Sequence, residues 1–436
     1  MNKKYDGKIL FIKNRCILSC IFEMWIILAV MFENFSKTEI AKKTFIFDNL
    51  RCFFAGLVET GFKNFALVIA IRIFNAPIFA KSVIASAMGI GFFITPISQA
   101  FAARAKKKTT MQISASYMLA VSLSIILSTL AKSYIEYLCT MLLAIILFRQ
   151  PISLIEDVYG QNYSLKERGS RISFSLMILP LSTLILSPIF GKFLDKETQH
   201  YKLILLAFAL AAIGEAISFM QIPARVLPAQ NKKSIFSNFG LMFSDKLFGI
   251  MLMLWTISGI ANRMVSPLKT EYLINPAYNI NASNYFEAMA CVTIPCAFRF
   301  LSSPAWGKIF DKNKLIISLV ALNVISAFSY ILFFNTKSQN IILVASILDG
   351  IVYGGKEIMW SLWVTKIAPI DKFSEYMSIN VAISGLRGII APYIGYSLSQ
   401  YLSLQQISIA ASVMVLISTF GFLSLNKHQR FMKSTN

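Results

Sequence analysis

The sequence is poor in charged residues, and above all in acidic residues, histidine and cysteine. Only 14% of its 436 residues are charged, Asp and Glu number 21 against 42 Lys and Arg, and there are 2 His and 6 Cys. A soluble chain of this length would carry far more charge. The cysteines form no CxxC pair or Cys/His cluster, so the sequence indicates neither a disulfide framework nor a zinc site. We therefore expect no metal and no cofactor.

Apolar residues are abundant instead. They make up 56% of the chain, and the net charge is +21. In a soluble protein such an excess of positive charge would suggest a nucleic-acid partner. Here the Lys and Arg residues stand in short stretches between long apolar runs, as in membrane proteins whose cytoplasmic loops are basic. We expect a lipid bilayer as the surroundings and no nucleic-acid partner.

Twelve apolar runs predict membrane-spanning helices. Each has about 20 residues, enough for ~30 Å of hydrocarbon at ~1.5 Å per residue. The runs are continuous, whereas the strands of a membrane β-barrel alternate apolar and polar residues. The prediction is an all-α integral membrane protein with spans near 53–75, 82–101, 110–131, 134–156, 171–191, 201–222, 247–267, 285–306, 314–334, 340–364, 376–398 and 405–425.

The spans fall into two sets of six, which predicts four segments. Residues 1–43 form a basic extension that fits a mis-set start, a peripheral helix or a poor extra span, because its apolar run 16–32 contains Glu23. Residues 44–222 and 247–436 each hold six helices, the second with a short tail. A polar linker, 223–246, joins them.

The basic residues predict the orientation. Most Lys and Arg outside the spans fall on one side of the membrane, together with both termini. The other side receives only Lys81, Lys132, Lys192, Lys196, Lys202, Lys269 and Lys337. This bias predicts that both termini are cytoplasmic. We expect the protein in the inner or plasma membrane of the cell.

Two internal similarities stand out. Residues 188–196 share the pattern Pro-x-x-Gly-Lys-x-x-Asp-Lys with residues 304–312, but the two stretches belong on opposite sides of the membrane. We interpret that match as a coincidence of loop chemistry. A second offset is better supported: residues 95–104 match 303–312, and residues 188–194 match 392–398, in both cases six helices apart and in the same orientation. The second offset is typical of transporters with parallel six-helix repeats.

With these features the chain resembles the major facilitator superfamily over about residues 44–430. That family's loop signature has Gly, three residues, Asp, a basic residue and further basic residues after helices 2 and 8. Gly307, Asp311 and Lys312 fit the second copy, with Lys314 after them. In the first copy Arg104 remains, while Gln99 and Ala103 replace Gly and Asp. The resemblance implies two six-helix bundles, alternating access and a monomer.

The resemblance also implies a role for the second loop. In this architecture Asp311 would face the start of helix 5, near Ser170 and Ser173, and hold the cytoplasmic side closed. A carboxylate is favoured at a helix N-terminus by ~0.3–1 kcal/mol. The alternative is that Asp311 ends its own helix and offsets neighbouring lysines.

Charged residues inside the spans are the candidate site, because each costs at least ~2.5–3.5 kcal/mol at the middle of the membrane. Asp349, Tyr353 and Lys356 share one helix face at i, i+4 and i+7, with Glu357 beside it. Either carboxylate could carry a proton, or could pair internally with Lys356. The remaining substrate or proton pathway candidates are Arg299, Arg387, Glu59 and Asn64.

Enzyme chemistry finds no support. Gly350, Gly355 and Lys356 spell most of a phosphate-binding loop, but the next residue is Glu357 and the stretch lies within a span, so we reject ATP binding. We expect a permease, not an enzyme, that moves a small organic solute by secondary active transport, by symport if protons are coupled. The alternatives are a drug or metabolite efflux antiporter, and a non-transporting receptor or interaction protein on the same scaffold.

Overall fold

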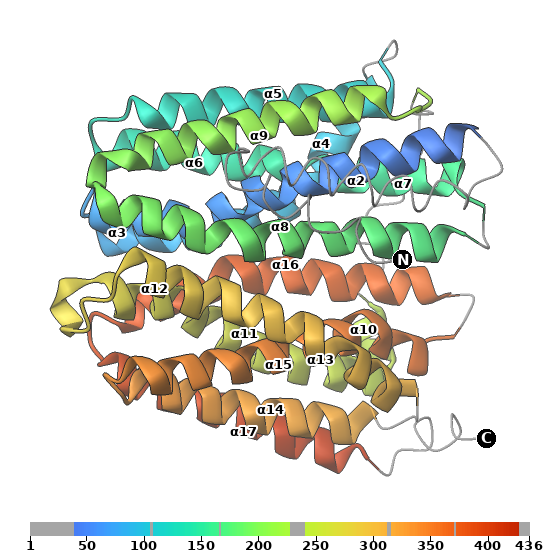
Figure 1. Cartoon of the computed structure of the whole chain (residues 1–436). Coiled ribbons are helices and arrows are strands. Elements are labelled where there is room, and N and C mark those ends of the chain that lie inside the picture. The colour runs from blue at the N-terminus through green and yellow to red at the C-terminus, as the bar shows by residue number, and fades with distance from the viewer. Residues whose placement is uncertain are drawn as a thin grey trace, which may run out of the picture.

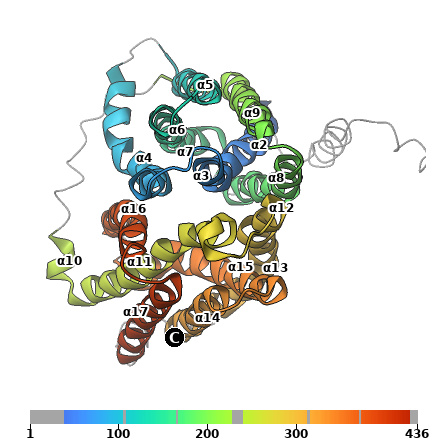
Figure 2. The ribbon, with the colours of Figure 1, turned by 90° about the vertical axis from the view of Figure 1, so that its left-hand side faces the viewer.

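The computed structural model describes residues 39–104, 108–164, 167–226, 240–311, 315–369 and 372–426. This part of the chain consists of helices and turns, with one isolated bridge between Thr109 and Val226. The apolar run 16–32 lies outside the described residues. The helices run roughly parallel in two groups, one above the other in Figure 1, and the view along the helices in Figure 2 separates the same two groups.

The first group holds the helices before residue 222. A π-helical turn lies within its first long helix, which is continuous through that turn. Its fourth predicted span consists of two helical pieces, the second of which follows Pro151. The elements are α2 (Glu39–Thr60), η3 (Gly61–Phe65), α3 (Ala66–Arg72), α4 (Ile78–Arg104), α5 (Thr110–Thr129), α6 (Tyr134–Phe148), α7 (Ile152–Asn162), α8 (Arg168–Lys196), η4 (Thr198–His200) and α9 (Tyr201–Gln221).

The second group follows after residue 240. A π-helical turn again interrupts its second long helix. The elements are α10 (Leu241–Ser244), α11 (Lys246–Ile274), η6 (Pro276–Tyr278), α12 (Asn284–Ala288), η7 (Met289–Thr293), α13 (Ile294–Asp311), α14 (Leu315–Phe334), α15 (Gln339–Leu362), η8 (Trp363–Lys366), α16 (Phe373–Leu398) and α17 (Leu404–Ser424).

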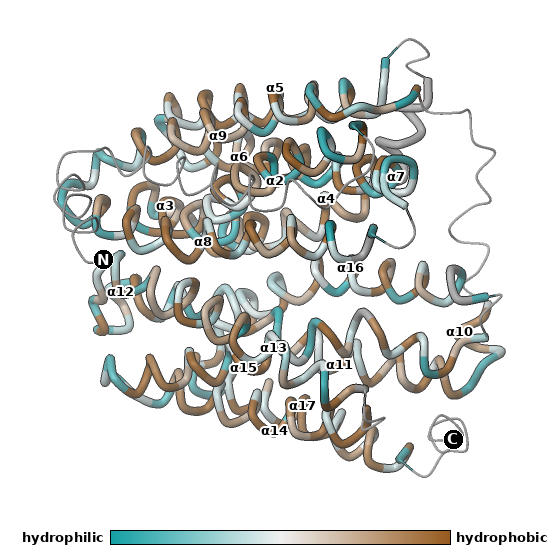
Figure 3. The backbone as a smooth tube through the Cα atoms, turned by 45° about the vertical axis from the view of Figure 1, so that its right-hand side comes forward, coloured by the Kyte–Doolittle hydropathy of each residue, from teal (hydrophilic) through white to brown (hydrophobic). Residues whose placement is uncertain are grey.

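Ten helical stretches of the described chain are long and apolar enough to cross a membrane. Two further helices complete the predicted twelve. α6 is short because the chain leaves the helix at Arg149 and Gln150, before Pro151, which cannot donate a backbone hydrogen bond. α15 has the length but carries Asp349, Lys356 and Glu357. Figure 3 shows hydrophobic colouring along most of α5, α9 and α14, as expected for helices in lipid.

The packing repeats between the two groups. In the first, α2 packs on α8 and α9, α4 on α6, and α5 on α6 and α9. In the second, α11 packs on α16 and α17, α13 on α15, and α14 on α15 and α17. Each contact recurs between the helices six positions later, which agrees with the parallel repeat seen in the sequence.

Three predicted span ends are wrong: the start of the first span, the start of the second span and the end of the seventh span. The first helix begins at Glu39, well before residue 53, because Asp48 and Arg51 are buried and paired at 2.7 Å inside it. Lys81 lies within α4 and Lys269 within α11, so neither is a loop lysine. In α11 the helix continues through Pro267, since a proline in a packed membrane helix can be tolerated when neighbours satisfy the freed backbone groups.

Two terms describe the long axis below. The near end is the end at which α2 begins and α17 ends. The far end is the opposite one, where α3, α8 and α11 end and α12 begins, on the left in Figure 1. In the orientation predicted from the basic residues, the near end is cytoplasmic.

Candidate functional site

Buried polar contacts join the two groups of helices toward the far end. Lys81 Nζ of α4 lies 2.6 Å from Glu271 Oε1 of α11, and both side chains are more than nine-tenths buried. Asn64 Nδ2 donates to Glu287 Oε2 at 2.9 Å, and Glu287 is fully buried. Arg72 donates to the carbonyl oxygen of Ala282. These contacts link the two groups at the far end, and separating the partners without exposing them to water would leave buried charges uncompensated.

Asp195 adds a further contact at the far end. Its carboxylate accepts hydrogen bonds from the backbone N–H of Asn284 at 2.7 Å, from Asn284 Nδ2 at 2.9 Å and from the backbone N–H of Tyr285 at 2.9 Å. One turn earlier, Gly191 lies so close that a Cβ there would meet the backbone oxygen of Asn284 at 2.7 Å. The stretch 188–196 therefore makes a defined contact between the groups, which its interpretation as coincidental loop chemistry missed.

Halfway along the molecule the two groups touch through glycines. A Cβ on Gly89 of α4 would lie 2.6 Å from the carbonyl carbon of Gly388 of α16. Ser86 donates to the carbonyl oxygen of Ile389 at 2.8 Å. Small residues allow such close backbone approach between membrane helices.

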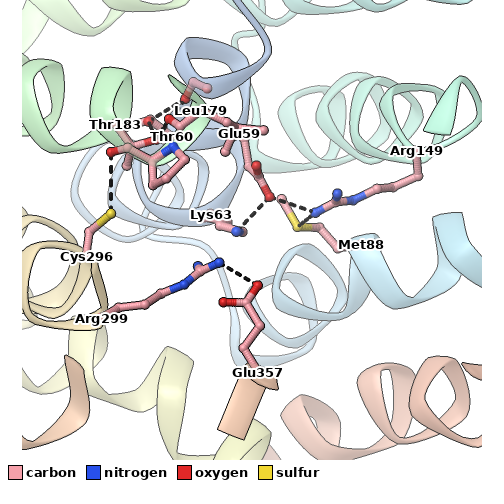
Figure 4. A network of polar contacts seen from close by, with 12 residues as sticks. Glu59, Thr60, Lys63, Met88, Arg149, Leu179, Thr183, Cys296, Arg299 and Glu357 are labelled. Carbon is pink, nitrogen blue, oxygen red and sulfur yellow. Dashed lines mark hydrogen bonds and ion pairs between the residues drawn. The ribbon is translucent and has the colours of Figure 1, made fainter. Parts of the chain in front are cut away.

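Charged side chains of both groups meet in the middle of the interface (Figure 4). In the first group, Glu59 Oε1 lies 2.6 Å from Lys63 Nζ and 3.2 Å from Arg149. In the second, Arg299 lies 2.6 Å from Glu357. The side chains of Lys63, Arg299 and Glu357 are 52%, 36% and 54% exposed, although they stand inside long helices and face one another across the interface. The described residues around these side chains therefore cover them only in part.

The predicted stripe on α15 faces α11. Asp349 pairs with Lys269 of α11, a residue that the sequence placed in a loop. The Asp349 carboxylate also accepts a hydrogen bond from Ser329 Oγ at 2.7 Å. Lys356 Nζ lies 3.4 Å from Ser258 Oγ of α11. Glu357 pairs with Arg299 and not with Lys356, so neither predicted carboxylate takes Lys356 as its partner. Tyr353, between them, is half-buried.

Arg387 and Asn64 also occupy defined places. Arg387 is nearly buried, donates to the carbonyl oxygen of Trp255 at 2.8 Å and packs against Gly259. Asn64 is not in the middle of the interface: it belongs to the far-end contact with Glu287.

The predicted cytoplasmic gate motif is only partly described. Among the described residues, no atom lies within 4 Å of a Cβ placed on Gly307, so this face of α13 has no close neighbour there in the described part of the chain. Asp311 is the last residue of α13, and Arg104 the last of α4, but their side chains are outside the described part, as is Lys312. The role of this motif stays a prediction.

The sequence analysis missed Arg263, Lys269, Glu271 and Glu287. Arg263 stands inside a predicted span and carried the same signal as Arg299, an arginine within an apolar run. Lys269 and Glu271 were overlooked because Pro267 suggested a helix end. Among the described residues, no three His, Cys, Asp or Glu side chains gather as for a metal ion.

Helices of this length, packed as two repeated groups around a shared polar interior, define a multi-pass membrane protein with the fold of solute transporters. The model of the Major Facilitator Superfamily matches residues 158–392 and 270–433. The chain belongs to this superfamily, and it is a transporter, not an enzyme.

Solved structures share the fold at low identity. The nucleoside transporter NupG is 12% identical, with 90% of this chain and 100% of that chain covered and a TM-score of 0.66. A D-xylose-proton symporter is 13% identical, with 89% and 98% covered and a TM-score of 0.67. The human organic anion transporter MFSD10 is 12% identical, with 88% and 100% covered and a TM-score of 0.59. A search of curated proteins returned no match.

Proposed function

We propose that the chain is a secondary active transporter that carries a small organic solute by alternating access between its two groups of helices. One observation carries this proposal. The polar contacts between the groups lie toward the far end, while exposed charges face each other in the middle of the same interface. A solute could enter from the near end and stop there. In the predicted orientation this conformation is open to the cytoplasm.

The proposed cycle reverses the closed end. To admit solute from the far side, the groups must separate at Lys81–Glu271, Asn64–Glu287 and Asp195–Asn284 while approaching each other at the near end. The gate motif at residues 307–312 would then make the opposing contact. Because binding shifts populations only through differential affinity, the solute must bind the open and closed arrangements unequally.

Proton coupling, where it operates, fits Glu287 better than Asp349 or Glu357. The latter two have cationic partners, Lys269 and Arg299. Glu287 is fully buried and forms no ion pair with any residue in the described ranges; its carboxylate receives neutral hydrogen bonds from Asn64, from Thr270 Oγ1 at 2.8 Å and from Cys291. Separation of the far end would expose Glu287 to the outer solution, where it could exchange a proton.

Flux through purified protein tests this proposal. Proteoliposomes would be offered nucleosides, sugars, dipeptides, carboxylates and phosphate esters, with and without a proton gradient. We expect saturable uptake of one class, with counterflow by the same solute. A gradient that drives uptake with proton flow indicates symport, and one that drives the solute against proton flow indicates efflux by antiport. Absence of saturable flux for every class would contradict the proposal and favour a receptor.

A further inference from the structure

We propose that the transported solute is a small organic anion with a carboxylate or phosphate group, held by Arg263, Lys356 and Arg387. This inference rests on the proposed transport function and names the substrate class of its site. Its basis is a contrast between cations that have carboxylate partners and cations that have none.

Several cations that stand inside the described long helices have an acidic partner. Arg51 pairs with Asp48, Lys81 with Glu271, Lys269 with Asp349, Arg149 and Lys63 with Glu59, and Arg299 with Glu357. Pairing is what makes a charge tolerable inside a membrane protein, because an isolated one costs at least ~2.5–3.5 kcal/mol at the bilayer centre. Arg263, Lys356 and Arg387 depart from this pattern.

None of these three cations forms an ion pair within the described ranges. Lys356 has Ser258 Oγ at 3.4 Å, and Arg387 has the carbonyl oxygen of Trp255. Arg387 Nε is buried and has no hydrogen-bond partner among the described residues, and Arg387 as a whole is 9% exposed. Arg263 forms no hydrogen bond with a described residue and is exposed, although it stands in the middle of α11. Their donors are therefore available to an acceptor from outside the chain.

The three side chains converge on one stretch of α11. Lys356 reaches it at Ser258 and Arg387 lies against Gly259, where a Cβ would come within 2.6 Å of Nη1. Arg263 leaves α11 one turn further on, and its Nη1 would lie 3.4 Å from a Cβ on Gly388, the neighbour of Arg387. The cations thus form a series along α11 that reaches the contact between Gly388 and Gly89 of the other group.

This arrangement suits an anion better than a neutral solute. Two guanidinium groups offer forked donors that match carboxylate or phosphate oxygens, and Lys356 adds a point charge. The nearby carboxylates Glu59, Asp349 and Glu357 already have cationic partners, so they do not cancel the positive charge. Keeping three cations without carboxylate partners costs free energy, which a bound anion would offset. A neutral solute would leave the three cations unpaired.

Binding to the purified full-length chain in detergent tests this inference apart from transport. The probes are succinate, glycerol 3-phosphate and inorganic phosphate, with succinamide and glycerol as neutral counterparts. At saturating concentration we expect an anion to raise the Tm by about 2 °C or more and its neutral counterpart to leave it unchanged. Succinate and glycerol 3-phosphate separate carboxylate from phosphate recognition, and inorganic phosphate shows whether the organic part is needed.

Variants locate the binding. Lys356→Gln and Arg387→Gln should each weaken the affinity for the anion at least ~10-fold, because each removes a charge-assisted contact. Lys356→Arg keeps the charge and should bind within a few-fold of wild type. The control is Lys337→Gln, an exposed lysine in the far-end loop 335–338, which should bind as wild type. If a Gln variant fails to fold, Gly259→Ala retains every charge but displaces Arg387, and should still weaken binding.

Two outcomes overturn the inference. One is that no anion probe stabilises the chain more than its neutral counterpart. The other is that anion affinity is the same in wild type, Lys356→Gln and Arg387→Gln. Saturable flux of a neutral solute without anion binding would preserve the proposed transport function and refute only the anionic substrate. Anion binding without flux of any solute would instead refute transport.

Discussion

Asp195, in the last turn of α8, accepts hydrogen bonds from both the backbone and the side-chain N–H groups of Asn284, at the start of α12. Because α12 continues through η7 into α13, this carboxylate lies at the N-terminus of a long helix of the other group. The positive end of the helix dipole and free backbone N–H groups both favour an anion there. The contact couples the end of one helix group to the beginning of a helix in the other.

Replacing this carboxylate should loosen the far end. Asp195→Asn keeps the shape but loses the charge, and we expect the fraction of molecules open at the far end to rise about two- to fivefold, the effect of a partly exposed charge at a helix terminus. The measurement is the rate at which a membrane-impermeant maleimide, added from the far side, labels Lys63→Cys in a background without the native cysteines. Glu197→Gln, two residues away with a 61% exposed side chain, should not change that rate. Equal labelling in Asp195→Asn and wild type would show that the contact does not restrain opening.

The buried pair Lys269–Asp349 should act in stability. Asp349→Asn leaves Lys269 buried without its carboxylate, which costs about 3–5 kcal/mol when one partner of a buried pair is removed. We expect a clear fall in Tm for the single variant, and substantial recovery in Lys269→Met/Asp349→Leu, which removes both charges. A single variant as stable as wild type would return Asp349 to the role of a proton carrier.

Glu287 should matter for coupling more than for folding. In Glu287→Gln the amide oxygen can still accept from Asn64, and the amide nitrogen can donate to the Thr270 hydroxyl, which also accepts hydrogen bonds, so the protein should fold. If protons are coupled, uptake driven by a proton gradient should disappear while counterflow, which needs no net proton movement, persists. The control is Glu375→Gln, an exposed residue at the start of α16. Unchanged gradient-driven uptake in Glu287→Gln would exclude Glu287 as the coupling group.

Gly89 in α4 and Gly385 in α16 should respond differently to replacement by alanine. Gly89→Ala forces a Cβ against the backbone of Gly388 and must push α4 away from α16. We expect this to slow transport by roughly tenfold, which corresponds to about 1.4 kcal/mol of added barrier. The Cβ of Gly385→Ala would meet no atom of the described residues within 4 Å, so this variant should transport as wild type. Equal rates in both variants would show that the α4–α16 contact does not control the cycle.

The fold was predictable from the sequence because hydropathy and length dominate in a bilayer. In a bilayer the backbone N–H and C=O groups must form hydrogen bonds within each helix, so continuous apolar runs of this length predict membrane-spanning helices. The exceptions have local causes: α2 begins early because Asp48 and Arg51 neutralise each other, and α11 runs through Pro267 because packed neighbours tolerate it. The π-helical turns η3 and η7 have no signature that we can identify in the sequence.

The site was predictable only as a set of residues. Charges within the spans identified Asp349, Lys356, Arg299 and Arg387, but pairing depends on which helix faces face each other. Lys269 was the partner of Asp349 because α11 and α15 adjoin in space, and helical spacing within α15 alone could not indicate that. The far-end contact of Asp195 was hidden for the same reason, since its partner Asn284 is in a different helix group.

The central claim is that the two helix groups open at one end while closing at the other. Spin labels at Lys132→Cys and Lys337→Cys would report the distance between the groups at the far end, and labels at Ser116→Cys and Ser424→Cys the distance at the near end, in a background lacking the native cysteines. On changing from solute-free protein to saturating solute under a proton gradient, the account predicts that the far-end distance lengthens as the near-end distance shortens. Distances that stay fixed, or that lengthen together, would contradict it.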